Sequence, residues 1–265
     1  MSILNDKVIW ITGASSGIGE ALAYELSKQG AKLIISARRL SELERVRNNC
    51  LKPLDVHCIP LDLSDCSTIP TISEEAIAIY GHIDILLNNG GISQRSLIKD
   101  TLLEVDRRVM EVNYFGTVAL TKAVLPSMIA RQSGHVVVVT SMVGIIATKF
   151  RSGYTASKHA LHGFFDTLRI EHYQDNIDVS IVCPGFIQTS ITMNALMGDG
   201  APQQKMDSVT KNGMPVDKCA RLIVRAIAKR KEEVYVSGMK EKLGAYMKRF
   251  FPGLFSKFIR NAKVT

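Results

Sequence analysis

The stretch KVIWITGASSGIG, residues 7–19, decides the fold of this chain. It begins with a short apolar run, as in a strand covered on both faces, and passes directly into a glycine-rich turn and a helix-forming segment. Glycines let the backbone approach an anion closely, and a helix N-terminus offers free N–H groups and partial positive charge. This order predicts a dinucleotide site, with cofactor contacts from Gly13, Ser15, Ser16, Gly17, Ile18 and Gly19.

Similar apolar runs recur along the chain, at Lys32–Ser36, Val56–Pro60, Ile83–Asn88, His135–Thr140, Val179–Cys183 and, more weakly, Glu233–Val236. Amphipathic segments lie between them. A capping box at Ser41–Glu44 predicts a helix start, and Asp106–Arg131 has the periodicity of one long helix. The alternation predicts an α/β fold, a Rossmann-type doubly wound parallel sheet with helices on both faces. No linker interrupts it, so we predict a single domain over residues 1–265.

Composition indicates an ordinary soluble protein of 265 residues, with 46% hydrophobic and 22% charged residues. The five cysteines form no C-x-x-C pair, which indicates reduced thiols, and we expect no metal site. The start of the chain lacks the features of a signal peptide, and no apolar run approaches the roughly 20 residues of a membrane-spanning helix. We therefore expect a cytoplasmic protein.

The net charge of +8 needs a cause. No nucleic-acid-binding motif accompanies it, so we expect no nucleic-acid partner. A phosphorylated small ligand or an acidic membrane surface would suit the charge equally well.

The second strand ends in Arg38 and Arg39, where NAD-type sites carry an acid that binds the ribose 2′-OH. Arginines there suit a 2′-phosphate, which favours NADP(H) over NAD(H), although both are also typical of a solvated surface loop. Asp62 ends the third strand, where a carboxylate accepts a hydrogen bond either from adenine or from the next turn.

Two pairs of residues have the spacing Y-x-x-x-K, namely Tyr24 with Lys28 and Tyr154 with Lys158. A random chain of this composition should contain about half a match, so the spacing alone has little weight. Residues four apart share a helix face, where a lysine ammonium favours the phenolate and equips tyrosine for proton transfer. Only Tyr154 follows a strand that ends at the ligand edge, with Ser141 at that strand's end. We expect the first pair to be inert.

Taken together, these motifs resemble the short-chain dehydrogenase/reductase family. The resemblance runs from about residue 5 to residue 190 and is carried, in the family's order, by Thr12–Gly19, Asn88–Gly91, Asn113, Ser141, Tyr154, Lys158 and Pro184–Thr189. It implies that Tyr154 is the general acid/base and that Lys158 lowers its pKa and bonds the nicotinamide ribose. Ser141 would orient the carbonyl, and Asn113 would hold a proton-relaying water.

The same resemblance extends the cofactor site. Asp62 and Leu63 would flank the adenine, Asn89 and Gly91 would lie along the adenosine ribose, and Ile187 and Thr189, with Pro184 and Gly185 of the same motif, would hold the nicotinamide end. Two residues depart from the family pattern: Gly90 stands where alanine is more common, and Ser16 where some NADP-using members carry a basic residue.

Residues 190–216 have little periodicity, and we expect them to form a substrate lid with Met193 and Met197 as apolar walls. The alternative is that these methionines fill gaps in the core. The tail, residues 240–265, mixes aromatic and basic residues and is split at Pro252-Gly253 into two short helices. It suits packing against the protein's own body, against a sister subunit, or on an anionic membrane.

These features predict an NADP(H)-dependent oxidoreductase, a carbonyl reductase or alcohol dehydrogenase, that acts on an apolar, lipid-, steroid- or ketone-like substrate. The alternatives are an NADP(H)-binding sensor without turnover and a 3-oxoacyl-type reductase. By family likeness we expect a homodimer or homotetramer.

Overall fold

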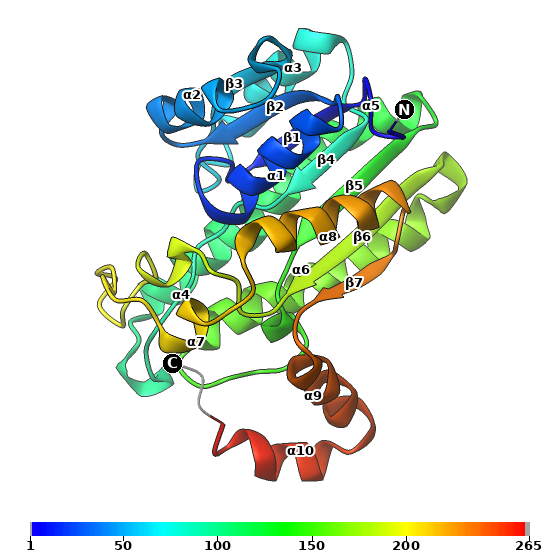
Figure 1. The fold of residues 1–265 in the computed structure, drawn as a ribbon. Coiled ribbons are helices and arrows are strands. Elements are labelled where there is room, and N and C mark those ends of the chain that lie inside the picture. The colour runs from blue at the N-terminus through cyan, green and yellow to red at the C-terminus, as the bar shows by residue number, and fades with distance from the viewer. Residues whose placement is uncertain (1, 263–265) are drawn as a thin grey trace.

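The computed structural model describes residues 2–262 and contains one seven-stranded sheet (Figure 1). Every neighbouring pair of strands is parallel, in the order β3-β2-β1-β4-β5-β6-β7. The strands are β1 Val8–Thr12, β2 Lys32–Ala37, β3 Val56–Pro60, β4 Ile85–Asn88, β5 Gly134–Val139, β6 Ile177–Pro184 and β7 Glu233–Val236. The predicted Rossmann-type sheet is therefore confirmed, and each strand lies within two residues of its expected bounds.

Helices cover both faces of the sheet. One face carries α1 Gly17–Lys28, α2 Leu40–Asn48 and α8 Val216–Ala228, and the other carries α3 Ile69–Tyr80, α5 Gly116–Ala130 and α6 Ser152–Glu171. Side chains alternate along a strand, so consecutive residues of β1 point to opposite faces of the sheet. Ile9 and Ile11 pack in the core beneath α1, α2 and α8, and Trp10 packs in the core beneath α3, α5 and α6. This two-sided burial explains why the strands have nearly continuous apolar sequences.

The order of the strands positions the ligand crevice. The chain moves outward from β1 through β2 to β3, then returns to place β4 on the other side of β1. Ligands bind open α/β sheets at such a reversal, beyond the carboxyl ends of the strands. The turns after Thr12, Asn88 and Val139 all leave the sheet at this edge.

Two helix predictions need correction. Helix α2 begins at Leu40, with Arg39 as its N-cap and no side-chain cap, so Ser41 already lies in the first turn and the predicted capping box is wrong. The long helix also has three parts: α4 Leu103–Met110, a π-helical turn at Glu111–Phe115, and α5. The wider turn contains Asn113, and such π-turns are frequent at functional sites.

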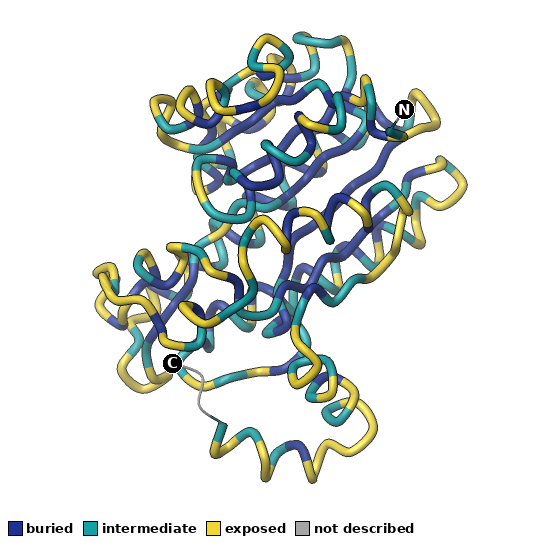
Figure 2. Tube along the Cα trace, in the orientation of Figure 1, coloured by how far each residue is buried: buried dark blue, intermediate teal, exposed yellow. Residues whose placement is uncertain are grey.

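The segment 190–216 and the tail up to residue 262 lie at the end of the molecule that carries the ligand edge (Figure 1), and residues 263–265 of the predicted tail lie outside the described residues. The segment contains the short helices Ser190–Thr192 and α7 Ser208–Lys211 and is otherwise irregular. The tail forms α9 Met239–Phe250 and α10 Pro252–Ile259, which confirms the break at Pro252. Much of both tail helices is exposed (Figure 2). No helix within residues 2–262 is long and apolar enough to cross a bilayer.

Candidate active site

The glycine-rich turn closes tightly over the start of α1. Gly13 has a φ of 65°, in the left-handed region, and a Cβ there would lie 2.8 Å from the Cα of Gly90. A Cβ on Gly19 would lie 2.3 Å from the Gly13 carbonyl oxygen. The backbone can therefore adopt this turn only with glycine at both positions, and it leads directly to the N-terminus of a twelve-residue helix.

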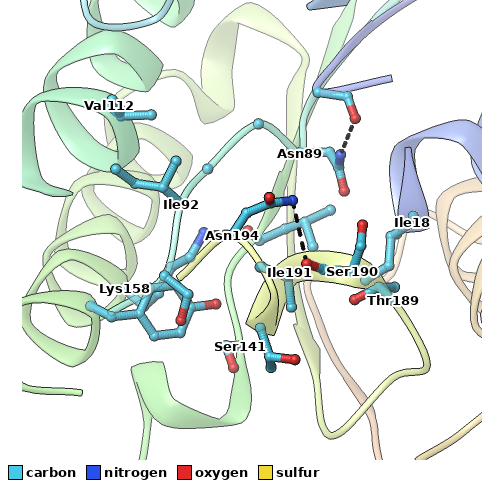
Figure 3. A pocket seen from close by; sticks show the side chains of 18 of the residues that line it. Ile18, Asn89, Ile92, Val112, Ser141, Lys158, Thr189, Ser190, Ile191 and Asn194 are labelled. Atoms are coloured by element: carbon cyan, nitrogen blue, oxygen red, sulfur yellow. Dashed lines mark hydrogen bonds between the residues drawn. The ribbon is translucent and has the colours of Figure 1, made fainter. Parts of the chain in front are cut away.

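Asn89 supports this turn from the end of β4. Its Nδ2 donates to the carbonyl oxygens of Thr12 at 3.0 Å and Gly13 at 3.3 Å (Figure 3). The Thr12 hydroxyl in turn accepts from the amides of Asn89 and Gly90, at 3.1 and 3.0 Å. Asn89 lines the cavity as expected, but its side-chain amide holds the turn in shape.

A single cavity of about 730 Å³ joins the turn to the ends of β4, β5 and β6. That size is within the usual range for a cofactor or ligand site. Its walls include every predicted cofactor residue except Gly19, together with Ser141, Tyr154 and Lys158. Asn113, Met193 and Met197 are not among the lining residues.

The end of the cavity where the sequence predicts the adenosine is basic. Arg38 and Arg39 are both exposed at the end of β2 and line the cavity. Burial acts to raise the pKa of Asp62, but hydrogen bonds from Ser64 and the charges of Arg38 and Arg108 outweigh it and hold that pKa below its usual value. Asp62 accepts from the Ser64 amide at 2.9 Å and hydroxyl at 2.7 Å, so it caps the next turn. Arg108 of α4 was not predicted, because only the fold brings it near this strand end.

Tyr154 and Lys158 lie in the first two turns of α6 and are almost completely buried, with exposed fractions of 9% and 4%. The Lys158 Nζ donates to the Val139 carbonyl oxygen at 3.0 Å and lies 5.8 Å from the centroid of the Tyr154 ring. Burial lowers the pKa of Lys158 to about 8.

The pKa of Tyr154 does not follow the prediction. Burial dominates and raises the pKa, while a hydrogen bond with Ser141 and the charges of Arg95 and Arg151 act in the opposite direction. The Lys158 ammonium donates to the Val139 carbonyl oxygen and lies 5.8 Å from the centroid of the Tyr154 ring, and the lowering of the Tyr154 pKa by Lys158 stays a prediction. The positive charges that favour the phenolate here are arginines that the motifs did not indicate.

Ser141 follows β5 and begins a short 3₁₀ turn, Met142–Gly144. Its hydroxyl accepts from the Val143 amide at 3.3 Å and donates to the Pro184 carbonyl oxygen at 3.4 Å. These bonds hold the side chain at the cavity wall. In Figure 3 Ser141 and Lys158 border one side of the space, and Thr189, Ser190 and Asn194 border another.

Asn113 is fully buried in the π-helical turn. Its amide exchanges two hydrogen bonds with the backbone of Ile92, at 2.8 and 2.9 Å, and donates to the Ser157 hydroxyl at 3.0 Å. Asn113 therefore joins the loop after β4 to the helix that carries Tyr154. The water relay that the family resemblance implies stays a prediction.

Gln94 is a site residue that the sequence analysis missed. It is fully buried, and its Oε1 accepts from the amides of Gly153 at 2.7 Å and Tyr154 at 3.4 Å. The side chain thus caps the N-terminus of α6 from 59 residues away in sequence. No local pattern indicates such a long-range cap.

The predicted methionine walls also need correction. Leu196 forms a parallel bridge with Gln94, accepting from the Arg95 amide at 2.8 Å and donating to the Ser93 carbonyl at 2.8 Å. Neighbouring residues of an extended segment point to opposite sides, so Leu196 faces the cavity while Met197 is 39% exposed. Met193 is half-buried away from the cavity, and the segment's contributions to the wall include Ile191, Thr192, Asn194 and Leu196.

Comparisons with known proteins agree with this geometry. The family model for short chain dehydrogenase matches residues 7–199. The chain is 45% identical to Dehydrogenase/reductase SDR family protein 7-like of Drosophila melanogaster over 258 residues, which cover 95% of this chain and 79% of that protein. It is 46% identical to Dehydrogenase/reductase SDR family member 7 of Homo sapiens over 255 residues, which cover 94% of this chain and 75% of that protein.

Solved structures show the same fold. An alcohol dehydrogenase from the archaeon Thermococcus sibiricus, complexed with 5-hydroxy-NADP, matches with a TM-score of 0.74 and 26% identity, over 89% of this chain and 97% of that one. A short chain dehydrogenase/reductase from Burkholderia phymatum, in complex with NAD, matches with a TM-score of 0.83 and 21% identity, over 96% of both chains. The present chain belongs to the short-chain dehydrogenase/reductase family of oxidoreductases.

Proposed function

We propose that this protein is an NADP(H)-dependent oxidoreductase that interconverts a carbonyl compound and the corresponding alcohol. The observation that carries the proposal is the single cavity that runs from the glycine turn to Ser141, Tyr154 and Lys158. Carbonyl reduction needs a bound nicotinamide cofactor and a proton donor, and this cavity is lined both by a glycine-rich turn suited to a dinucleotide and by Tyr154.

The shape of the cavity fits the cofactor. Gly13 and Gly19 leave no room for side chains at the turn, and the start of α1 suits a pyrophosphate. Lys158, Ile187 and Thr189 would hold the nicotinamide end, where the bound cofactor supplies or accepts the hydride.

In the direction of reduction, the Ser141 hydroxyl would bond the substrate oxygen and the Tyr154 hydroxyl would give it a proton. In oxidation, Tyr154 would take the proton from the alcohol. The near-complete burial of Tyr154 keeps bulk water away from this transfer.

Preference for NADP(H) is supported by the adenosine end. Arg38 and Arg39 stand where NAD-type sites place an acid, and Arg108 adds a third cation near Asp62. Guanidinium groups suit a 2′-phosphate through charge-assisted hydrogen bonds. The absence of a basic residue at Ser16 leaves this task to these arginines.

An apolar substrate is supported by the cavity walls, which include Val112, Val143, Ile146, Ile191 and Leu196; of these, Val143 and Leu196 pack in one cluster with Tyr154. The test is NADPH oxidation against ketones and aldehydes of increasing apolar size, with NADH in parallel. We expect turnover with NADPH that is lost in Tyr154→Phe. Tight NADPH binding with no turnover on any carbonyl would favour the sensor, and turnover confined to 3-oxoacyl thioesters would favour the other alternative.

Contact with an anionic membrane is a second part of the proposal. The C-terminal apolar surface consists of side chains that are each more than half exposed: Leu243, Tyr246, Phe250, Phe251, Leu254 and Phe258. Basic residues lie among them, including Lys240, Lys242, Arg249 and Lys257. Helix α9 also contributes Glu241 to the cavity wall, so this surface adjoins the substrate entrance.

Vesicle flotation tests the membrane contact with the fold intact. Phe255 and Ala245 are buried and hold the two helices to the body, so substituting the exposed Phe250 and Phe251 with serine spares those contacts. We expect the double variant to lose flotation with phosphatidylserine vesicles, while Leu54→Ser, at a residue 95% exposed elsewhere, retains it. Equal flotation of both variants would remove the membrane role and leave a cytoplasmic enzyme.

Self-association is the third part. Members of this family act on small molecules and typically form oligomers, and we propose a homodimer or homotetramer. Light scattering coupled to size-exclusion chromatography measures the mass in solution. A mass of 29.2 kDa, that of one chain, at all protein concentrations would exclude self-association.

A further inference from the structure

Three buried charged side chains meet beside the catalytic helix, and none belongs to the family motifs described above. Arg95, Arg151 and Asp207 have exposed fractions of 7%, 3% and 6%. Arg95 Nε lies 2.8 Å from Asp207 Oδ2, and Arg151 Nη2 lies 3.3 Å from the same oxygen. Burying charges costs free energy unless they are paired, so a cluster of this kind calls for an explanation.

The three side chains come from different parts of the fold. Arg95 lies in the loop after β4, Arg151 is the N-cap of α6, and Asp207 lies in the segment 190–216 that borders the substrate space. Asp207 is fixed further by Gln203, whose Nε2 donates to Oδ1 at 3.0 Å, and by Thr192, whose hydroxyl accepts from the Asp207 amide at 3.3 Å. The cluster thus ties the segment to the start of the catalytic helix.

The backbone around Arg151 shows how firmly this position is held. Phe150 has a φ of 66°, a left-handed conformation that is unfavourable for a bulky residue. Its carbonyl accepts from the Ser96 amide at 3.0 Å, next to Arg95. Strain of this kind persists only where surrounding contacts enforce it, and here it lies directly before Arg151, the N-cap of α6.

Both arginines act electrostatically on the Tyr154 hydroxyl. Tyr154 is three residues beyond Arg151 in the first turn of α6, and Arg95 and Arg151 line the same cavity. Their positive charges oppose the effect of burial on the pKa of Tyr154. Asp207 offsets part of this charge because it pairs with both guanidinium groups.

We propose that Asp207, acting through Arg95 and Arg151, is a positioning residue that sets the charge around the Tyr154 hydroxyl, so that the segment over the substrate also tunes proton transfer. The inference rests on the proposed function, because it uses Tyr154 as the proton-transfer group. In this inference the ionisation of Tyr154 depends on Asp207, which lies in a segment without any catalytic motif.

The direction of the effect follows from the charges near Tyr154. Arg95 and Arg151 act on its hydroxyl, and Asp207 pairs with both of them. The other charged groups nearby are Lys158, 5.8 Å from the ring centroid, Asp106 of α4 next to Gly153, and Glu241 of α9 on the cavity wall. Removing the Asp207 charge leaves the arginine charges less compensated and favours the phenolate. Removing the charge of Arg95 does the opposite. The two substitutions should therefore shift the phenol ionisation in opposite directions.

The test measures ionisation of the Tyr154 phenol by ultraviolet difference absorbance, over the pH range in which circular dichroism reports a native fold. Each variant is compared with the same variant carrying Tyr154→Phe, so the other tyrosines cancel. We expect Asp207→Asn to lower the ionisation pH by about one unit or more and Arg95→Gln to raise it. Asp199→Asn, at an exposed carboxylate of the same segment, should leave it unchanged, and Asp207→Glu should restore it.

The outcomes separate this inference from the proposed function. The role of Asp207 would be overturned if Asp207→Asn and Asp199→Asn gave the same ionisation pH for Tyr154. It would also be overturned if Arg95→Gln lowered that ionisation pH. If Asp207→Asn does not fold, the Arg95→Gln shift and the Asp207→Glu titration decide the question. The titration needs no turnover and can therefore succeed in a protein that reduces no carbonyl. In that case opposite shifts of the Tyr154 ionisation pH would contradict the proposed function and still support the effect of Asp207 on Tyr154.

Discussion

Helices α1 and α6 both carry a tyrosine four residues before a lysine, and the fold gives the two pairs opposite surroundings. In α1 the Tyr24 hydroxyl donates to Glu20 at 2.8 Å, and burial together with this carboxylate raises the pKa of Tyr24 to about 12. The Lys28 side chain is 61% exposed and lies 3.8 Å from Glu25. Neither Tyr24 nor Lys28 lines the cavity.

In α6, Tyr154 lies near the Ser141 hydroxyl and near Arg95 and Arg151, and Lys158 is buried. Tyr154 hydrogen-bonds with Ser141, and the pKa of Lys158 falls to about 8. The spacing places two side chains on one face of a helix, and nothing more. What they can do depends on side chains that other elements bring to them.

The largest expected effect is on turnover. Tyr154→Phe removes the proton donor and should lower kcat by about 10²- to 10⁴-fold, the usual contribution of a general acid. Tyr24→Phe should keep kcat within about twofold, since its hydroxyl interacts with Glu20 and Arg45 and Tyr24 does not line the cavity. NADPH binding, followed by fluorescence, should persist in both variants. Equal losses of kcat in the two variants would contradict the claim that only the α6 pair takes part in catalysis.

A smaller effect should distinguish binding from chemistry. Replacing the exposed Arg38 and Arg39 with alanine removes charged partners of a 2′-phosphate, each worth up to about 1 kcal/mol at such a solvent-screened position. The KM for NADPH should rise about tenfold or more, with little change in kcat or in the KM for NADH. Steady-state kinetics with both cofactors checks this. A parallel rise in both KM values would show that the arginines do not select the phosphate.

The third effect is a pH dependence. Lys158, with a pKa of about 8, carries its proton below that pH and loses it as the pH rises. Its positive charge near Tyr154 and the expected nicotinamide ribose should then be lost, so kcat/KM for reduction should fall by about half near pH 8. Lys158→Met should abolish this inflection and Lys28→Met should retain it. A profile that stays flat well above pH 8 would contradict the assignment.

The smallest effect is on stability. Tyr24→Phe deletes one partly buried hydrogen bond, to Glu20, and should reduce the free energy of unfolding by about 1 kcal/mol. Urea unfolding monitored by circular dichroism measures it. A loss several times larger would mean that the α1 pair has a structural role that its surroundings do not indicate.

The fold was largely predictable because it rests on local patterns. Each strand is buried on both faces and therefore appears as a continuous apolar run. Within the turn, the left-handed φ of Gly13 and the close contact of Gly19 with the Gly13 carbonyl oxygen favour glycine at both positions. The start of α2 was misplaced because Ser41 resembles a cap in sequence, while the backbone is already helical at Leu40.

The surroundings of the site were much less predictable. Arg95 and Asp207 are 112 residues apart in sequence, and Gln94 caps a helix 59 residues away. Such contacts form only when the loop after β4, the start of α6 and the segment 190–216 come together. Met193 and Met197 suited an apolar wall by residue type, but the bridge at Leu196 decides which side chains face the cavity.

A pair of double-mutant cycles tests most directly the claim that surroundings, not spacing, make a catalytic pair. The measurement is the single-turnover rate of NADPH oxidation in Tyr154→Phe, Lys158→Met and the double variant, and in Tyr24→Phe, Lys28→Met and their double variant. Residues that act as a unit are strongly non-additive, so the α6 double variant should react about as slowly as Tyr154→Phe alone, while the α1 variants all stay near the wild-type rate. Fully additive losses in α6, or losses of similar size in α1, would contradict the account.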